Sequence, residues 1–182
     1  MQKGIAIIHQ ELNLIEEMSV AENIFMGRYP SSGGRISWKN LHDESKRLLD
    51  KLGMDINPKT KVGSLSIGQK QMVEIAKALS FDAQIIIMDE PTDALTDSEA
   101  ESLFKVIKEL VSEGKSVVYI SHRLPEIFQI CDDITILRDG QFIDEMPVSE
   151  MDETILIEKM VGRKLEEQYP YIEIHNFIIM PN

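Results

Sequence analysis

The chain has 182 residues, of which 43% are hydrophobic and 27% charged, the balance of one soluble globular domain. Its formal net charge of −12 argues against nucleic-acid partners, because binding phosphates requires clustered Lys and Arg. The single cysteine, Cys131, excludes an internal disulfide, and no apolar stretch approaches the roughly 18 residues that span a bilayer, so direct membrane insertion is not expected.

Two elements are predicted at the beginning of the chain. The apolar run 4–8 predicts a buried strand that delivers Gln10 to the edge of a sheet. Ser19 and Glu22 have the spacing of a capping box, so a short helix is expected to begin there and to end at Gly27.

A loop and a second helix follow. Residues 30–34, with the sequence Pro-Ser-Ser-Gly-Gly, have the composition of a surface loop. Leucines at helical spacing predict a helix from about residue 41 to Gly53. With the neighbouring helices, these elements predict a helical insert over about residues 15–80.

Two longer helices are marked by capping boxes. Ser66 and Gln69 precede apolar residues spaced as i, i+3, i+4 and i+7, which form one buried helix face. Thr96 and Glu99 begin a second amphipathic helix, which Gly114 is expected to end.

Apolar runs alternate with these helices along the chain. The runs 85–88 and 117–120 predict parallel strands, and their continuous apolar character predicts helices on both faces of the sheet. An Asp-Gly pair between residues 134–137 and 141–143 predicts a late antiparallel hairpin, and residues 149–161 predict a last helix. The fold class is therefore α/β, with a mostly parallel sheet whose functional loops lie at the carboxyl ends of the strands.

Three motifs follow one another in the chain. Leu-Ser-Ile-Gly-Gln occupies residues 65–69, Asp89-Glu90 ends one apolar run, and Ser121-His122 ends another. In this order and spacing, over nearly the whole chain, they resemble the nucleotide-binding subunits of ABC transporters. The resemblance implies the P-loop NTPase-like fold of ABC ATPases, and ATP and Mg²⁺ as cofactors.

Two carboxylates that end a buried strand are costly unless something binds them. The resemblance implies that Asp89 orients Mg²⁺ through its water shell and that Glu90 polarises the attacking water as general base. It also implies that His122 contacts the γ-phosphate, and that Gln10 senses Mg²⁺ and communicates with the membrane subunit. The structural alternative for the two acids is the start of a solvated loop.

The Leu-Ser-Ile-Gly-Gln segment places a hydroxyl, a glycine and unpaired backbone N–H groups at a helix N-terminus, which is an anion site. The resemblance implies that Ser66, Gly68 and Gln69 grip the γ-phosphate of an ATP held by a second ATPase domain. It also places Asp93 in a loop that passes beside its counterpart across the dimer. A structural role is equally compatible, since an N-cap serine stabilises a helix by about 1 kcal/mol.

The phosphate loop of this family, Gly-x-x-x-x-Gly-Lys-[Ser/Thr], does not occur in the sequence. Residues 63–70 imitate its spacing, but Gln69 stands where the lysine is required. We therefore expect a fragment that lacks the N-terminal strands and the phosphate loop, with negligible ATPase activity alone. Residues 1–165 are expected to form a partial ABC ATPase domain and residues 166–182 a linker or aberrant tail. Its apolar run, 177–180, is an aggregation risk.

Residues 9–12, 93–96 and 160–166 resemble the sugar-import branch of the family, closest to bacterial ribose import ATPases. This resemblance implies a subunit that hydrolyses ATP to power ribose import from the cytoplasmic face of the bacterial inner membrane. Its partners would be membrane permease subunits, a second ATPase domain and, indirectly, a sugar-binding protein. Two alternatives stay open: a non-enzymatic remnant or module that binds the permease, and a DNA-repair-type ABC ATPase. The absence of sustained heptads and of a basic surface argues against the second.

Overall fold

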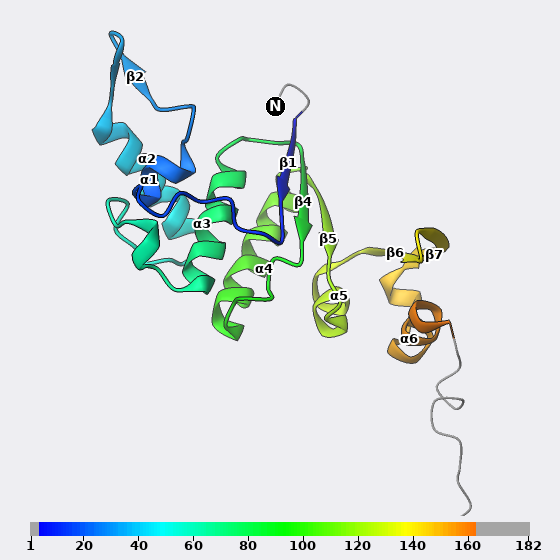
Figure 1. The fold of residues 1–182 in the computed structure, drawn as a ribbon. Helices are drawn as coiled ribbons and strands as arrows, with labels where there is room; N and C mark the ends of the chain where they lie inside the picture. The colour runs from blue at the N-terminus through cyan, green and yellow to red at the C-terminus, as the bar shows by residue number, and fades with distance from the viewer. Residues whose placement is uncertain (1–3, 163–182) are drawn as a thin grey trace, which may run out of the picture. The chain divides into compact units, whose positions relative to one another are not determined.

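The computed structural model describes residues 4–162 (Figure 1). Two compact units divide between Arg123 and Leu124. Between residues 4 and 162 no helix has the length and apolarity needed to cross a membrane. The boundary expected at residue 165, the tail 166–182 and its apolar run 177–180 lie outside the described residues.

The first unit alternates short strands with helices. Its elements are β1 (Ile5–Ile8), α1 (Val20–Ile24), β2 (Ser31–Ser32), β3 (Arg35–Ile36), α2 (Trp38–Lys51), the 3₁₀ turn η1 (Val62–Ser64), α3 (Ile67–Leu79), β4 (Ile85–Asp89), α4 (Asp97–Ser112) and β5 (Ser116–Ile120).

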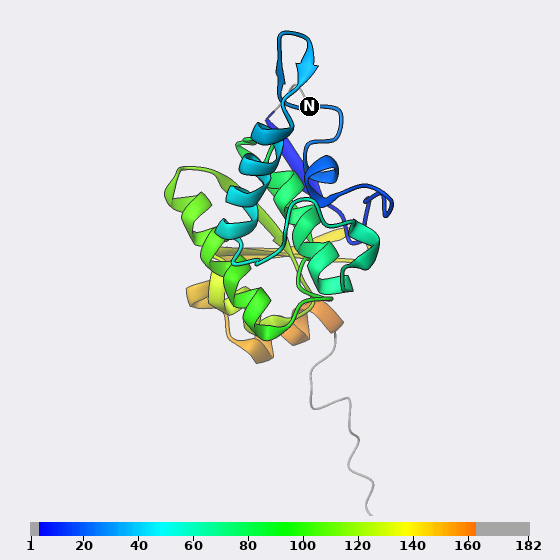
Figure 2. The ribbon, with the colours of Figure 1, turned by 90° about the vertical axis from the view of Figure 1, so that its left-hand side faces the viewer.

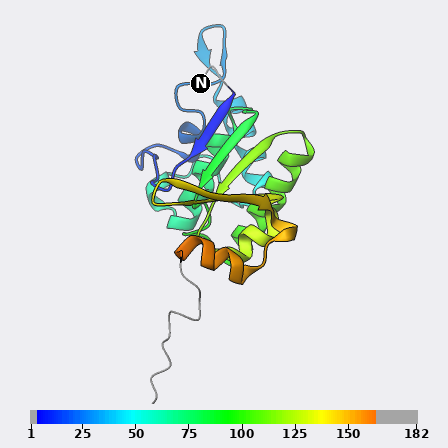
Figure 3. The same cartoon turned by 90° about the vertical axis from the view of Figure 1, so that its right-hand side faces the viewer.

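A parallel sheet with the order β1-β4-β5 forms the centre of this unit, and Figure 3 shows the three strands side by side. In the register, Ile8 pairs with Met88, and Asp89 pairs with Ile120. The three strands therefore end close together at one edge of the sheet, as the sequence predicts for parallel strands.

One face of the sheet is buried and the other is not. Ala6, Ile8, Ile86 and Met88 are at most 2% exposed on the face against which α3 and α4 pack (Figure 2). On the opposite face, apolar side chains are 38–48% exposed: Ile5, Ile7, Ile85, Val118 and Ile120. Within this unit the helices thus cover one face, where the continuous apolar runs predicted two. A continuous apolar run indicates that a strand is compatible with burial on both faces. Whether a helix packs on the second face depends on other segments of the fold.

Capping boxes begin three helices as predicted. Ser19, Ser66 and Thr96 each accept a hydrogen bond from the backbone N–H three residues later, at the starts of α1, α3 and α4. Helix α1 ends at Ile24, three residues before the glycine expected to end it. Helices α1, α2 and α3 pack against one another in the region predicted as a helical insert.

The loop predicted at residues 30–34 contains part of a small antiparallel hairpin, β2-β3. Gly33 and Gly34 form its two-residue turn and both have positive φ, +59° and +77°. Two adjacent glycines favour a two-residue hairpin turn. The composition of residues 30–34 predicted a loop but not this hairpin.

The second unit contains a short helix, a hairpin and a last helix. Its elements are α5 (Leu124–Ile130), β6 (Asp133–Arg138), β7 (Gln141–Pro147), the 3₁₀ turn η2 (Val148–Glu150) and α6 (Glu153–Val161). The late hairpin is confirmed, and Asp139 and Gly140 turn it with φ of +52° and +74°. The last helix begins at Glu153 rather than at residue 149, because the Asp152 carboxylate accepts the Ile155 N–H and caps it.

Buried apolar side chains from α5, β6, α6 and the segment before α6 form one cluster: Ile127, Ile134, Ile136, Val148, Met151 and Leu156. Cys131 packs against this cluster and is half-buried, and burial raises the pKa of its thiol. A raised pKa keeps the thiol protonated and poorly nucleophilic, so Cys131 acts here as a small apolar side chain.

Candidate active site

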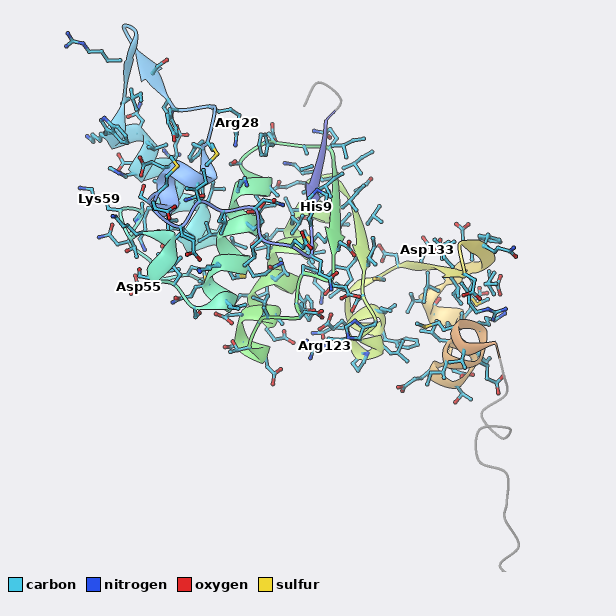
Figure 4. All side chains as sticks on the ribbon, in the orientation of Figure 1. His9, Arg28, Asp55, Lys59, Arg123 and Asp133 are labelled. Atoms are coloured by element: carbon cyan, nitrogen blue, oxygen red, sulfur yellow. The ribbon has the colours of Figure 1, made fainter. Side chains whose placement is uncertain are left out.

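Three polar side chains meet where the parallel strands end. Gln10 lies two residues beyond β1, Glu90 directly after β4, and His122 two residues beyond β5. The Gln10 side-chain amide Nε2 donates to Oε2 of Glu90 at 2.9 Å, and Nδ1 of His122 lies 3.2 Å from Oε1. Figure 4 labels two residues adjacent to these in sequence, His9 directly after β1 and Arg123 directly before α5.

The sheet order explains this meeting. Because β4 lies between β1 and β5, Glu90 receives one contact from each neighbouring strand end. The Glu90 backbone N–H donates to the Ile120 carbonyl at 2.9 Å, and its φ is +47°, a left-handed conformation that is uncommon outside glycine. The Glu90 side chain is 25% exposed, so the carboxylate is held by its neighbours and still reaches solvent.

Asp93 joins this group through a turn. Its backbone N–H donates to the Glu90 carbonyl at 3.4 Å. As a result, one ligand atom from each of Glu90, Asp93 and His122 lies within 4.8 Å of the others. The four residues Gln10, Glu90, Asp93 and His122 are hereafter the sheet-edge cluster.

Asp89 is the last residue of β4, pairs with Ile120 and is half-buried. The residues expected to bind Mg²⁺, Asp89 and Gln10, offer a carboxylate oxygen and an amide oxygen. Since the Gln10 side chain donates through nitrogen to Glu90, its oxygen stays available as a ligand. Oxygen donors of this kind fit Mg²⁺, which prefers carboxylates, carbonyls and water.

The N-terminus of α3 holds the other predicted group. The Gln69 N–H donates to Ser66 Oγ at 3.2 Å, and the Ser66 N–H donates to Gln69 Oε1 at 3.0 Å. Both side chains therefore satisfy backbone groups of their own helix end, as the structural alternative expects. Ser66 is exposed, so the same hydroxyl is accessible from outside the unit.

Gly68 links this helix end to the loop that follows Asp93. A Cβ on Gly68 would lie 2.9 Å from the Ala94 carbonyl oxygen and 3.1 Å from Oε2 of Glu99. Only glycine fits there without a shift of its neighbours. The sequence identifies Gly68 as part of a motif. It does not predict the contact with Ala94, because residue 94 lies in a segment distant in the sequence.

Sequence reasoning did not single out Thr92. This side chain is 1% exposed, and its Oγ1 lies 3.4 Å from the Tyr119 hydroxyl in β5. Thr92 stands in the turn between Glu90 and Asp93, so it anchors that turn to the neighbouring strand. The signal in the sequence was its position directly after Pro91 and the two acids.

A parallel sheet with polar strand ends, a helical insert and a late antiparallel hairpin together define the P-loop ABC ATPase fold, which solved ATP-binding cassettes share. The ABC transporter family matches residues 1–93, about half of the chain, and the chain belongs to that family.

Three solved structures illustrate the likeness. The dimeric cassette MJ0796, in a post-hydrolysis state bound to ADP and Pi, is 27% identical with a TM-score of 0.70, covering 81% of this chain and 64% of that one. The ADP conformation of MJ1267, an ATP-binding cassette of an ABC transporter, is 27% identical with a TM-score of 0.69, covering 87% and 67%. A nucleotide-free ATP-binding cassette from an ABC transporter is 26% identical with a TM-score of 0.65, covering 87% and 65%. The chain thus spans about 64% of the length of the first of these.

Proposed function

We propose that this chain is an ATP-binding subunit of an ABC transporter, in which ATP hydrolysis at the sheet edge powers import of a sugar. One observation carries the proposal. The Glu90 carboxylate is held at both oxygens, by Gln10 at 2.9 Å and by His122 at 3.2 Å, where three parallel strands end. Contacts at both oxygens fix the orientation of this carboxylate, which supports a role as general base.

In this proposal Glu90 polarises the water that attacks the γ-phosphate. Its oxygen Oε1, which lies 3.2 Å from Nδ1 of His122, would share that water with the imidazole. Gln10 keeps the carboxylate in orientation through Oε2 and, with Asp89, offers oxygen ligands to Mg²⁺. Bound Mg²⁺ would neutralise charge on the β- and γ-phosphates.

Ser66, Gly68 and Gln69 would meet the γ-phosphate of an ATP held by a second ATPase domain. Ser66 and Ile67, at the N-terminus of α3, are exposed, and the helix dipole there favours an anion, which supports this role. Asp93 would lie in the same dimer interface. The loop that contains Asp93 contacts Gly68 through the Ala94 carbonyl oxygen. The two segments proposed for the dimer interface, this loop and the N-terminus of α3, are therefore neighbours within one chain.

The transported substrate is proposed to be ribose, on the likeness of residues 9–12, 93–96 and 160–166 to ribose import ATPases. The chain would then bind permease subunits at the cytoplasmic face of the bacterial inner membrane, with a sugar-binding protein acting on the other side. Residues 1–165 are proposed as the ATPase domain that makes these contacts.

The test is sugar-stimulated ATP hydrolysis by the chain assembled with its permease, ribose-binding protein and second ATPase domain. Glu90→Gln is expected to lower turnover by at least about 100-fold, the usual contribution of a positioned general base. Glu145→Gln, the same carboxylate-to-amide change at an exposed position in β7, is the matched control and should leave turnover unchanged.

The isolated chain should show negligible turnover, because its sequence contains no phosphate loop, whereas in the assembly the second ATPase domain would hold the ATP. Loss of even one preorganised donor costs about 2.7 to 4 kcal/mol. Assembly with the permease without any effect of Glu90→Gln would contradict the catalytic role and favour an interaction module. Turnover stimulated equally by unrelated sugars would contradict the ribose assignment only.

A further inference from the structure

Three metal-ligating side chains of different types converge in the sheet-edge cluster. Glu90 follows β4, Asp93 lies in the turn after it, and His122 follows β5. One ligand atom from each residue lies within 4.8 Å of the others. Since all three belong to the first unit, the convergence is fixed by the sheet and by one backbone turn.

The distances approach those of a tetrahedral metal site. Two ligands that bind Zn²⁺ at about 2.0–2.2 Å in tetrahedral geometry lie roughly 3.4 Å apart. Oε1 of Glu90 and Nδ1 of His122 are 3.2 Å apart, close to that separation, so a side-chain rotation that turns both atoms toward a common ion would complete this pair of ligands. A carboxylate oxygen of Asp93 lies within 4.8 Å of a ligand atom of each of these two residues, and this side chain is exposed and therefore has room to rotate toward them.

The donor set selects the class of metal. An imidazole nitrogen with two carboxylates suits Zn²⁺ and similar transition-metal dications, whereas Mg²⁺ prefers oxygen ligands alone. Three protein ligands would leave one position open, as in catalytic zinc sites. His122 is 62% and Glu90 25% exposed, so an ion can enter from solvent. The Gln10 amide, 2.9 Å from the other Glu90 oxygen, supplies the outer partner that orients a ligating carboxylate.

We propose that Glu90, Asp93 and His122 bind a transition-metal dication such as Zn²⁺ in the nucleotide-free chain. This site differs from the Mg²⁺ position at Asp89 and Gln10 in its ligands and in needing no ATP. A bound Zn²⁺ would occupy the Glu90 carboxylate and so inhibit hydrolysis. That consequence rests on the proposed function, whereas binding itself does not.

The test is a calorimetric titration of Zn²⁺ into the full chain, without nucleotide and with Mg²⁺ in large excess. One Zn²⁺ per chain is expected, and His122→Ala and Asp93→Ala should each weaken binding by at least about tenfold, the lower limit for loss of even an outer-shell partner. His42→Ala is the matched control, because His42 is half-buried beside Trp38 in α2, outside the cluster, and should leave the affinity unchanged.

Co²⁺ gives a second readout through its visible absorption, which identifies tetrahedral coordination. Intense bands that disappear in Glu90→Gln are expected. Absence of saturable Zn²⁺ binding, equal binding by His122→Ala, or displacement of Zn²⁺ by Mg²⁺ would each overturn the proposal. A thermal melt of each variant confirms folding. Because no step uses ATP, a failed ATPase assay leaves the binding result intact, and failed metal binding leaves the proposed hydrolysis untouched.

Discussion

Arg28, labelled in Figure 4, ties the end of α1 to the end of α3. Its Nη1 donates to the Ser80 carbonyl at 3.1 Å, and its Nη2 donates to Ser80 Oγ at 2.7 Å and to the Ile24 carbonyl at 3.1 Å. The guanidinium lies 3.6 Å from the ring centroid of Phe81, and burial lowers its pKa. A planar group with several donors thus joins two helices and stacks on an aromatic ring.

Arg28→Lys is expected to lower the free energy of unfolding by about 1–3 kcal/mol, because an ammonium keeps the charge but neither stacks flat nor satisfies two carbonyls and a hydroxyl at once. Urea unfolding followed by circular dichroism measures the change. Arg47→Lys, at an exposed position on α2, is the control and should shift the value by less than about 0.5 kcal/mol. Equal stability of the two variants would show that charge alone matters at position 28.

Gly68 gives a second prediction for a single residue. Gly68→Ala would place a methyl group 2.9 Å from the Ala94 carbonyl oxygen, which is too close for a real contact. Overpacking of this kind costs about 1–3 kcal/mol, and this cost outweighs the gain in helix propensity from alanine. Chemical unfolding measures it, with Ile67→Ala, 65% exposed in the same turn, as control. An unchanged free energy of unfolding in Gly68→Ala would mean that the loop containing Ala94 moves away from the added methyl group at no measurable cost.

Among the elements, α1 is a five-residue helix that depends on its capping box. The Ser19 N–H donates to Oε2 of Glu22 at 2.9 Å, and hydrogen bonds from Ser19 hold the pKa of that carboxyl below its ordinary value. A lowered pKa in the folded state means that the unfolded chain binds more protons in acid. The stabilisation is therefore complete above the unfolded pKa, about 4.3, and is lost as the pH falls through the folded value.

Glu22→Gln tests this dependence. Glutamine can still complete the capping box, so the variant should fold, but it lacks the titrating charge. The difference in unfolding free energy between wild type and Glu22→Gln should be largest near neutral pH and should shrink as the pH falls below about 4.3. Urea unfolding at a series of pH values measures it. A difference that stays constant with pH would show that Glu22 does not contribute through its charge.

Local signals account for what the sequence predicted well among the elements. Capping boxes at Ser19, Ser66 and Thr96 specify helix starts within a few residues, so the predicted starts agree with the structure. The turn at Asp139 and Gly140 specifies the late hairpin in the same way. The exposed face of the sheet was not predicted, because what covers a strand depends on distant segments.

The same distinction applies to the candidate site. The meeting of Gln10, Glu90 and His122 follows from one rule, that the carboxyl ends of neighbouring parallel strands share an edge. The packing of Gly68 against Ala94 follows from no such rule, because it depends on how a helix end and a distant loop approach each other.

For the whole molecule, net charge and exposed apolar surface have opposite effects on association between molecules. At pH 7 the formal net charge of −12 keeps molecules apart. The first unit nevertheless exposes a row of apolar side chains across its sheet, in which Ile7 and Val118 are 47% and 48% exposed on either side of Ile87. Contiguous apolar surface of this kind favours association once repulsion is removed.

The chain should therefore associate increasingly as the pH falls from 7 toward its isoelectric point of about 4.8. The double variant Ile7→Thr/Val118→Thr should reduce this association, because threonine keeps the β-branched shape that suits a strand while removing apolar surface. Dynamic light scattering at fixed protein concentration measures it. Val111→Thr, on α4 and 45% exposed, removes similar surface outside the sheet and should have little effect. If both variants associated like the wild type, the row across the sheet would not be the surface through which the molecules meet.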